Sequence, residues 1–295
     1  MGGGGGGGGP KVGKSALVNA LVGSKVAITS SRPQTTRNTI RGVVTGPDPS
    51  DPEYQIVLVD TPGLHKPRTE LGSRLNSMVY GTLNEADVVV FMIDATAPIG
   101  PGDRLVAQRL EEAESTVVLV VNKADRADKA EIADQLAKAG EWDFAAYVPL
   151  SARDGTGLQP LIDEIVERLP EGPRFYPEGM TTDQPESMVI SEIVREKFLE
   201  RLHEEVPHSL LVRVEDIEQR ENGILDISAD VIVERSSQKG IVIGKGGSLL
   251  KVAGTEAREE LETLLGAKVN LMLHVVVEKD WQVRSQMLDR FGFDL

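Results

Sequence analysis

Four short apolar runs, rich in β-branched residues, recur through the first half of the chain, at 54–59, 88–93, 116–121 and 146–150. Runs of this length bounded by polar residues predict buried strands. Between them, apolar residues recur at helical spacing, for example over 104–114 and 129–140. Strands that alternate with helices predict a doubly wound α/β fold with a mostly parallel sheet, which binds ligands at the carboxyl ends of its strands.

The second half follows a different order. After several prolines between 170 and 185, apolar residues at helical spacing over 190–202 predict an amphipathic helix. Strand-like runs follow at 210–215 and 224–233, with the turn signal Asn222-Gly223 between them, and then a helix at 248–265 and a strand at 269–277. We therefore predict a first domain over 1–170, a linker over 171–187 and a smaller α+β domain over 188–295.

Composition narrows the class of protein. The 295 residues suit two domains, and 40% hydrophobic with 26% charged residues is typical of a folded protein. The absence of cysteine excludes disulfides and thiolate metal sites, and the net charge of −14 argues against general coating of nucleic acid. No apolar run approaches the ~20 residues that a transmembrane helix needs.

Eight of the 30 glycines form one run, residues 2–9. Glycine has no side chain to pack inside a sheet and loses much entropy when it is ordered. We interpret the run as a tag or as a replacement for natural sequence, because the next motif needs a buried strand before it. A flexible natural tail is the alternative.

Residues 8–15, G-G-P-K-V-G-K-S, match the phosphate-binding pattern G-x-x-x-x-G-K-[ST] and lead into a predicted helix at 15–22. Lys14 would neutralise phosphate charge, and the Ser15 hydroxyl would bind Mg²⁺. Only Gly13-Lys14-Ser15 is independent of the glycine run, so a glycine-rich turn is the alternative for this motif alone. The predicted phosphate-site residues are Gly8, Gly9, Pro10, Lys11, Val12, Gly13, Lys14, Ser15 and Ala16.

Polar motifs follow the apolar runs. The first ends in Asp60-Thr61-Pro62-Gly63, where Asp60 can hold Mg²⁺ through water and the Gly63 N–H can sense a γ-phosphate. The third ends in Asn122-Lys123-Ala124-Asp125, and the fourth leads into Ser151-Ala152. Alone, N-K-A-D is as consistent with a solvated turn, but the ordered set predicts a nucleotide site.

The base is predicted from Asp125, whose carboxylate can accept two hydrogen bonds from N1–H and the 2-amino group of guanine. Adenine offers neither donor and would leave a buried charge unpaired, at a cost of several kcal/mol. The Lys123 stem would cover the purine face, Asn122 would brace the loops, and the Ala152 N–H would reach guanine O6. We therefore expect GTP and GDP as ligands.

From Pro10 onward the chain resembles the Era family of GTPases. Residues 33–38, P-Q-T-T-R-N, look like the family's switch I, and residues 60–67, D-T-P-G-L-H-K-P, look like its switch II. The resemblance implies that Thr36 joins Ser15 and Asp60 around Mg²⁺, that Lys14, Thr36 and Gly63 act in catalysis, and that Leu64 lies beside the nucleotide. Related GTPases carry asparagine in place of Lys11, in association with a monovalent cation. Lys11 therefore puts K⁺ binding in doubt: its ammonium takes that place, or it is a solvated surface lysine.

The second domain contains Gly244-Lys245-Gly246-Gly247, which matches the GXXG loop that lets a KH domain approach a nucleic-acid backbone. Alone this loop is as consistent with a simple turn. Its place in an α-β-β-α-β order resembles the family's type II KH domain, and a small α+β interaction domain is the alternative. Residues 235–255 hold four basic and no acidic residues, although 186–295 has 14 basic and 21 acidic ones. The predicted RNA-binding residues are Arg235, Lys239, Ile243, Gly244, Lys245, Gly246, Gly247 and Lys251.

The resemblance implies a switch that binds and hydrolyses GTP, binds the 3′ end of small-subunit ribosomal RNA and assists assembly of the 30S subunit. It implies a cytoplasmic monomer with peripheral contact at the inner face of the membrane, and no metal beyond Mg²⁺. The alternative is an RNA-binding assembly chaperone that binds nucleotide with negligible turnover, because the glycine run removes the strand that should support the phosphate loop.

Hydrolysis without partners is predicted to be slow. Ras-like GTPases orient the attacking water with a glutamine, whereas this chain has Leu64, whose side chain neither donates nor accepts a hydrogen bond. We expect an intrinsic rate on the order of 10⁻³ s⁻¹ or below. Phosphate release by the purified protein alone would measure it, and a substantially faster basal turnover would refute the prediction.

Overall fold

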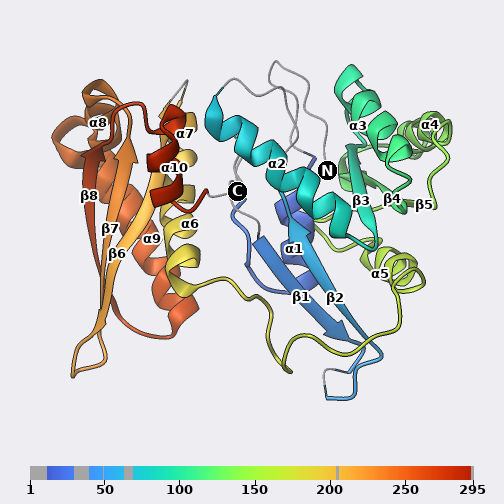
Figure 1. The fold of residues 1–295 in the computed structure, drawn as a ribbon. Coiled ribbons are helices and arrows are strands. Elements are labelled where there is room, and N and C mark those ends of the chain that lie inside the picture. Colours follow the sequence, from blue (N-terminus) through green and yellow to red (C-terminus); the bar gives the residue numbers. More distant parts are fainter. Residues whose placement is uncertain (1–11, 30–39, 49, 63–68, 204–205, 294–295) are drawn as a thin grey trace. The chain divides into compact units, whose positions relative to one another are not determined.

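A computed structural model describes residues 12–29, 40–48, 50–62, 69–203 and 206–293 (Figure 1). It divides into two compact units, with the main boundary between Asp183 and Gln184. The linker expected over 171–187 spans this boundary. None of the helices in the described ranges is long and apolar enough to cross a membrane.

The first unit alternates strands and helices, as expected. Its parallel sheet has the order β3-β4-β5, formed by Val89–Asp94, Val117–Asn122 and Ala146–Pro149. A separate antiparallel pair consists of β1 (Ile40–Gly46) and β2 (Tyr54–Asp60). The helices are α1 (Lys14–Val22), α2 (Glu70–Glu85), α3 (Pro101–Glu112), α4 (Lys129–Ala139) and α5 (Leu158–Val166). The prediction of an α/β fold with a mostly parallel sheet is confirmed, whereas β1 was not predicted.

Strand β4 forms the centre of the first unit, and all six of its residues are buried. Val117, Leu119 and Val121 belong to one hydrophobic cluster, and Val118 and Val120 belong to a second cluster. Successive side chains of a strand point to opposite faces of the sheet, so both faces of β4 are covered. The strand therefore brings Asn122, its last residue, to a fixed position at the carboxyl edge.

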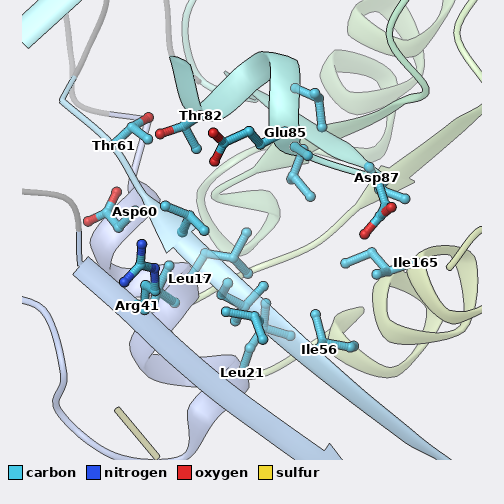
Figure 2. Close-up of a pocket in the computed structure, with 18 of the residues that line it drawn as sticks. Leu17, Leu21, Arg41, Ile56, Asp60, Thr61, Thr82, Glu85, Asp87 and Ile165 are labelled. Atoms are coloured by element: carbon cyan, nitrogen blue, oxygen red, sulfur yellow. The ribbon is translucent and has the colours of Figure 1, made fainter. Parts of the chain in front are cut away.

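A cavity of about 400 Å³ lies between β2 and β3, which are not paired with each other in the described structure (Figure 2). Leu17, Leu21, Ile56 and Ile165 line it with apolar atoms, and Asp60 stands at its edge. A buried strand is expected immediately before the phosphate loop. The glycine run that stands there in the sequence lies outside the described residues.

The segment after α5 is attached to the β1–β2 pair. The Gln55 amide oxygen accepts hydrogen bonds from the N–H groups of Phe175 and Tyr176 (3.0 and 2.9 Å), and its nitrogen donates to the Tyr176 carbonyl (3.0 Å). Further along, the Val43 N–H donates to Thr181 O (2.8 Å). Most of the expected linker, residues 171–183, is therefore part of the first unit.

The second unit has one three-stranded sheet of order β6-β7-β8, formed by Leu211–Gln219, Leu225–Val233 and Val269–Val277. β6 and β7 are antiparallel, and β7 and β8 are parallel. Its α-helices are α6 (Glu186–Leu199), α7 (Val206–Ser209), α8 (Ser236–Ile243), α9 (Ser248–Leu265) and α10 (Ser285–Arg290). Helix α8 was not predicted; the Gln238 side chain stabilises its start by accepting from the N–H groups of Glu234 and Arg235 (2.9 and 3.1 Å).

Apolar side chains in the glycine run should stabilise the first unit. We expect the triple substitution Gly3→Val, Gly5→Val, Gly7→Val to raise the free energy of unfolding, on the order of 1.5 kcal/mol per fully buried valine. Chemical denaturation measures the gain. Threonine at the same three positions is the matched control, because it has the same shape but must bury a hydroxyl. Equal stability of the valine and glycine proteins would contradict the expectation.

Candidate functional site

The phosphate loop joins helix α1 through Gly13, whose φ of +91° lies in the region that favours glycine. A Cβ at this position would lie 2.6 Å from Asn122 Nδ2, so a side chain is excluded by contact as well as by conformation. The loop therefore passes close to the end of β4, and Lys14 opens α1. The N-terminus of a helix favours negative charge, as a phosphate would supply.

Lys14, Ser15 and Asp60 come together although 45 residues separate Ser15 from Asp60. The Ser15 hydroxyl donates to Asp60 Oδ2 (2.7 Å), and Asp60 is buried at the end of β2. Removal from bulk water lowers the pKa of Lys14, and the Asp60 carboxylate partly offsets this shift. A lysine held in this way gains stabilisation when an anion arrives, which suits a phosphate site.

The same two oxygens fit a magnesium ion. A hydroxyl and a carboxylate are hard oxygen ligands of the kind that Mg²⁺ prefers, and their contact shows that one ion can reach both. Thr61 and Pro62 continue from β2 and are buried. The remaining predicted residues on this side, namely Gly8, Gly9, Pro10, Lys11, Thr36, Gly63 and Leu64, lie outside the described residues.

Asn122 connects three segments of the site. Its Nδ2 donates to the Val12 carbonyl (2.7 Å), and its Oδ1 accepts from the Ala152 N–H (3.0 Å). The side chain is buried, so both hydrogen bonds are partly shielded from water. The predicted bracing role of Asn122 therefore has a geometric basis. The Ala152 N–H, predicted to reach guanine O6, is held at the site by this bond.

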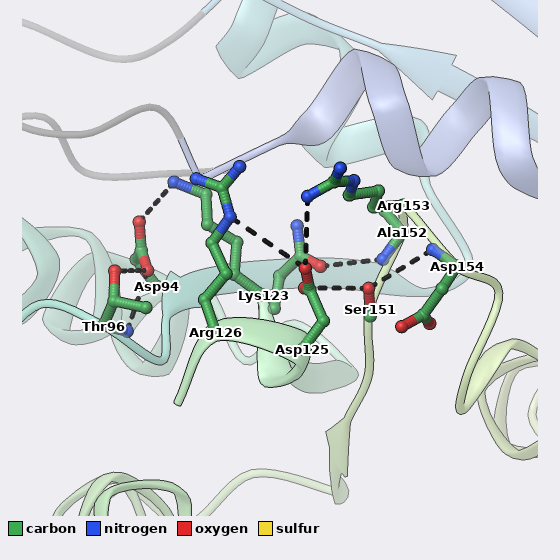
Figure 3. A network of polar contacts seen from close by, with 10 residues as sticks. Asp94, Thr96, Lys123, Asp125, Arg126, Ser151, Ala152, Arg153 and Asp154 are labelled. Atoms are coloured by element: carbon green, nitrogen blue, oxygen red, sulfur yellow. Dashed lines mark hydrogen bonds and ion pairs between the residues drawn. The ribbon is translucent and has the colours of Figure 1, made fainter. Parts of the chain in front are cut away.

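The Asp125 carboxylate is fixed on one side by a hydrogen bond (Figure 3). Oδ1 accepts from the Ser151 hydroxyl (2.9 Å), and Ser151 is fully buried. Arg126 Nε and Arg153 Nη1 each lie 3.9 Å from Oδ2. The Ala124 N–H donates to Leu150 O (3.1 Å) and ties the two loops together. Ser151 thus orients the carboxylate that would select guanine.

Asp94 and Thr96 lie near the residues predicted to bind the base, which form the base side of the site, but they are not among the site residues predicted from the sequence. Lys123 Nζ lies 2.5 Å from Asp94 Oδ2, and Thr96 donates to Asp94 Oδ1 through its N–H and its hydroxyl (Figure 3). The available signal was the position of Asp94 at the end of the second apolar run, next to Asn122 across the parallel pair. Three strands therefore contribute to the base side.

The GXXG loop of the second unit joins α8 to α9. Gly244, Gly246 and Gly247 have φ values of +74°, +60° and +78°, and a Cβ on Gly244 would lie 2.9 Å from the Leu249 nitrogen. Lys245 and Lys251 are exposed, Ile243 is half-buried, and Arg235 and Lys239 lie on the preceding helix start and helix. The loop presents a sharply turned backbone together with cations, which suits contact with a phosphate backbone.

Comparisons with known proteins match both units. A family described as 50S ribosome-binding GTPase matches residues 7–123, and the KH domain family matches residues 205–282. GTPase Era of Mycolicibacterium smegmatis is 48% identical over 290 residues, covering 96% of this chain and 95% of that protein. GTPase Era of Mycobacterium tuberculosis is 47% identical with the same coverage.

Two solved structures have the same architecture along nearly the whole chain. An Era variant from Aquifex aeolicus, bound to GDP and AlF4⁻, superposes with a TM-score of 0.90 at 38% identity, covering 97% of this chain and 96% of that one. An Era complex with MgGDPNP and nucleotides 1506–1542 of 16S ribosomal RNA has a TM-score of 0.90 at 39% identity, covering 98% and 97%. With matching GTPase and KH models and curated relatives aligned over almost its full length, this chain belongs to the Era family of GTPases.

Proposed function

We propose that this protein binds GTP, hydrolyses it to GDP and phosphate, and binds the 3′ end of small-subunit ribosomal RNA to assist assembly of the 30S subunit. The proposal rests on one observation. Residues suited to bind phosphates and residues suited to bind the base come together at the carboxyl ends of the strands of the first unit. Lys14, Ser15 and Asp60 form the first group. Asn122, Lys123 and Asp125 form the second.

The chemistry is attack of water on the γ-phosphate. Lys14 neutralises charge on the β- and γ-phosphates as the bond to the leaving group lengthens. Ser15 and Asp60 would hold Mg²⁺, which supplies charge neutralisation at the phosphate oxygens when it is bound. By resemblance, Thr36 completes this shell and the Gly63 N–H meets the γ-phosphate. The side chain at position 64 is leucine and supplies no hydrogen bond to the water.

RNA binding is assigned to the second unit. The Era structure that superposes on this chain was solved with 16S ribosomal RNA, and its coverage includes the KH domain. In this chain the GXXG loop contains Lys245 and is flanked in the sequence by Lys239 and Lys251, and none of these three lysines makes an ion pair with a described residue. We propose that these lysines contact phosphates, and that the protein acts as a cytoplasmic monomer with peripheral membrane contact.

A second function is favoured by one observation, the glycine run that stands in the sequence where a supporting strand is expected before the phosphate loop. A phosphate loop that lacks a packed strand can bind nucleotide and yet hold it too loosely for catalysis. The protein would then serve as an RNA-binding assembly chaperone with negligible turnover. Single-turnover hydrolysis at saturating GTP separates the two functions, since only the GTPase forms GDP. The two roles of Lys11 separate in the same assay: if its ammonium replaces the monovalent cation, hydrolysis does not depend strongly on K⁺ over Na⁺, and a strong K⁺ requirement would contradict that role.

Base recognition by Asp125 gives a direct test. We expect Asp125→Asn to lower GDP affinity at least 100-fold, because the amide replaces a carboxylate that should accept both guanine donors. Titration with GDP measures the loss. Asp128→Asn is the matched control: it makes the same chemical change at the N-cap of α4, where the Asp128 side chain accepts from the Glu131 N–H and asparagine caps equally well. Equal affinities of the two variants would contradict the assignment.

The RNA interface is tested by charge removal. We expect Lys245→Ala and Lys251→Ala each to weaken binding of single-stranded RNA and to reduce the slope of log affinity against log salt by about 0.7. Fluorescence anisotropy at several salt concentrations measures both effects. Lys279→Ala removes the same charge from an exposed site outside 235–255 and serves as the control. If all three variants behave alike, the interface does not lie at the GXXG loop.

A further inference from the structure

Asp94 is buried at the carboxyl end of β3 and is fully engaged. Its Oδ1 accepts from the Thr96 N–H (2.9 Å) and the Thr96 hydroxyl (2.7 Å), while Oδ2 lies 2.5 Å from Lys123 Nζ. The parallel pairing places Asp94 opposite Asn122, and the Ala95 N–H donates to Asn122 O (2.8 Å). The carboxylate is therefore fixed relative to the loop that begins at Lys123.

Lys123 has an unusual backbone and a side chain with one described charged partner. Its φ is +66°, a left-handed conformation that is uncommon outside glycine. Its side chain is 24% exposed, against 4% for Asp94. A lysine side chain carries large rotamer entropy, and an ion pair to a rigid acceptor removes much of that freedom. The stem of Lys123 is thereby held along one path.

The Asp94 carboxylate keeps its charge under ordinary conditions. Burial by itself would raise the pKa of Asp94, but the hydrogen bonds from Lys123 and Thr96 outweigh burial and hold the pKa below its ordinary value. A carboxyl of lowered pKa is ionised at neutral pH and loses its contribution only as the pH falls through its folded value. The contact therefore persists throughout the neutral range.

We propose that Asp94 is a positioning residue for guanine nucleotides: by holding the Lys123 ammonium, it keeps the aliphatic stem of Lys123 in place to cover the purine face. The inference rests on the proposed binding of guanine nucleotides at this site. The rival role for Asp94 is purely local, as the acceptor that shapes the turn between β3 and α3 through Thr96. The two roles predict different losses of affinity when the carboxylate charge is removed. The positioning role lowers affinity only for ligands that carry a purine base, whereas the local role lowers affinity for all ligands alike.

The test compares three ligands on Asp94→Asn and on the unchanged protein. GDP carries the whole recognition surface, IDP lacks the 2-amino group but keeps the purine face, and ribose 5-diphosphate keeps the phosphates without a base. We expect Asp94→Asn to lower GDP and IDP affinity by the same factor, about tenfold, the effect of a lost charged hydrogen bond. Affinity for ribose 5-diphosphate should not change.

Two control variants sharpen the test. Thr96→Val removes one hydroxyl bond to Asp94 and leaves the Lys123 contact, so it should keep GDP affinity within about twofold. Ser151→Ala releases Asp125 and should lower GDP affinity more than IDP affinity, since only GDP offers the 2-amino group. If the unchanged protein does not bind GDP, the proposed function itself is wrong. If it binds GDP and Asp94→Asn does not change the GDP affinity, only the inference about Asp94 is wrong.

A uniform loss for all three ligands in Asp94→Asn would overturn the positioning role in favour of the local one. Should Asp94→Asn unfold the first unit, Lys123→Met examines the contact from its other end, because methionine keeps an aliphatic stem without the ammonium. We expect Lys123→Met to lose GDP and IDP affinity about tenfold and to keep affinity for ribose 5-diphosphate. Unchanged GDP affinity in Lys123→Met would also overturn the inference.

Discussion

The side-chain amide of Asn122 is the contact on which the nucleotide site depends. It donates to the Val12 carbonyl of the phosphate loop and accepts from the Ala152 N–H of the loop after β5. Both bonds are partly buried, and loss of this amide would leave a carbonyl and an N–H without this partner. The same amide explains the glycine at position 13, where any Cβ would meet Nδ2 at 2.6 Å. One buried side chain thus sets the separation between the phosphate and base sides.

This position is stable because β4 is buried on both faces. Val118 and Val120 pack into one cluster, and Leu119 and Val121 pack into the other, so the strand cannot slide without exposing apolar surface to water. The acids at the ends of neighbouring strands then perform different tasks. Asp60 accepts a hydrogen bond from Ser15, Asp94 holds a lysine, and Asp125 is oriented by Ser151. Their partners, rather than their residue type, determine these roles.

The sequence predicts best where local pattern and burial agree. The apolar run at 116–121 ends in N-K-A-D, and both the strand and the motif appear where expected. Strand β1 was not predicted because Arg41 and Gly42 interrupt its alternation, and it is held by pairing with β2 and by hydrogen bonds with residues 181 and 182, which lie far away in the sequence. Helix α8 was missed because its eight residues include Gly240, and its start depends on the Gln238 side chain. Asp94 was missed because its role appears only when β3 and β4 lie side by side.

The attachment of the expected linker to the first unit has a consequence for how the two halves of the chain communicate. Residues 181–183 are bonded to β1 through Val43 and Arg41, and the Arg41 guanidinium reaches Asp183 (3.2 Å). Strand β1 begins at Ile40, two residues after the segment that resembles switch I. Strand β1 therefore lies between that segment in the sequence and, through its hydrogen bonds to residues 181 and 182, the chain just before α6, which begins at Glu186. A route of hydrogen bonds of this kind carries coupling between nucleotide state and RNA binding only to the extent that β1 is held differently in the two nucleotide states.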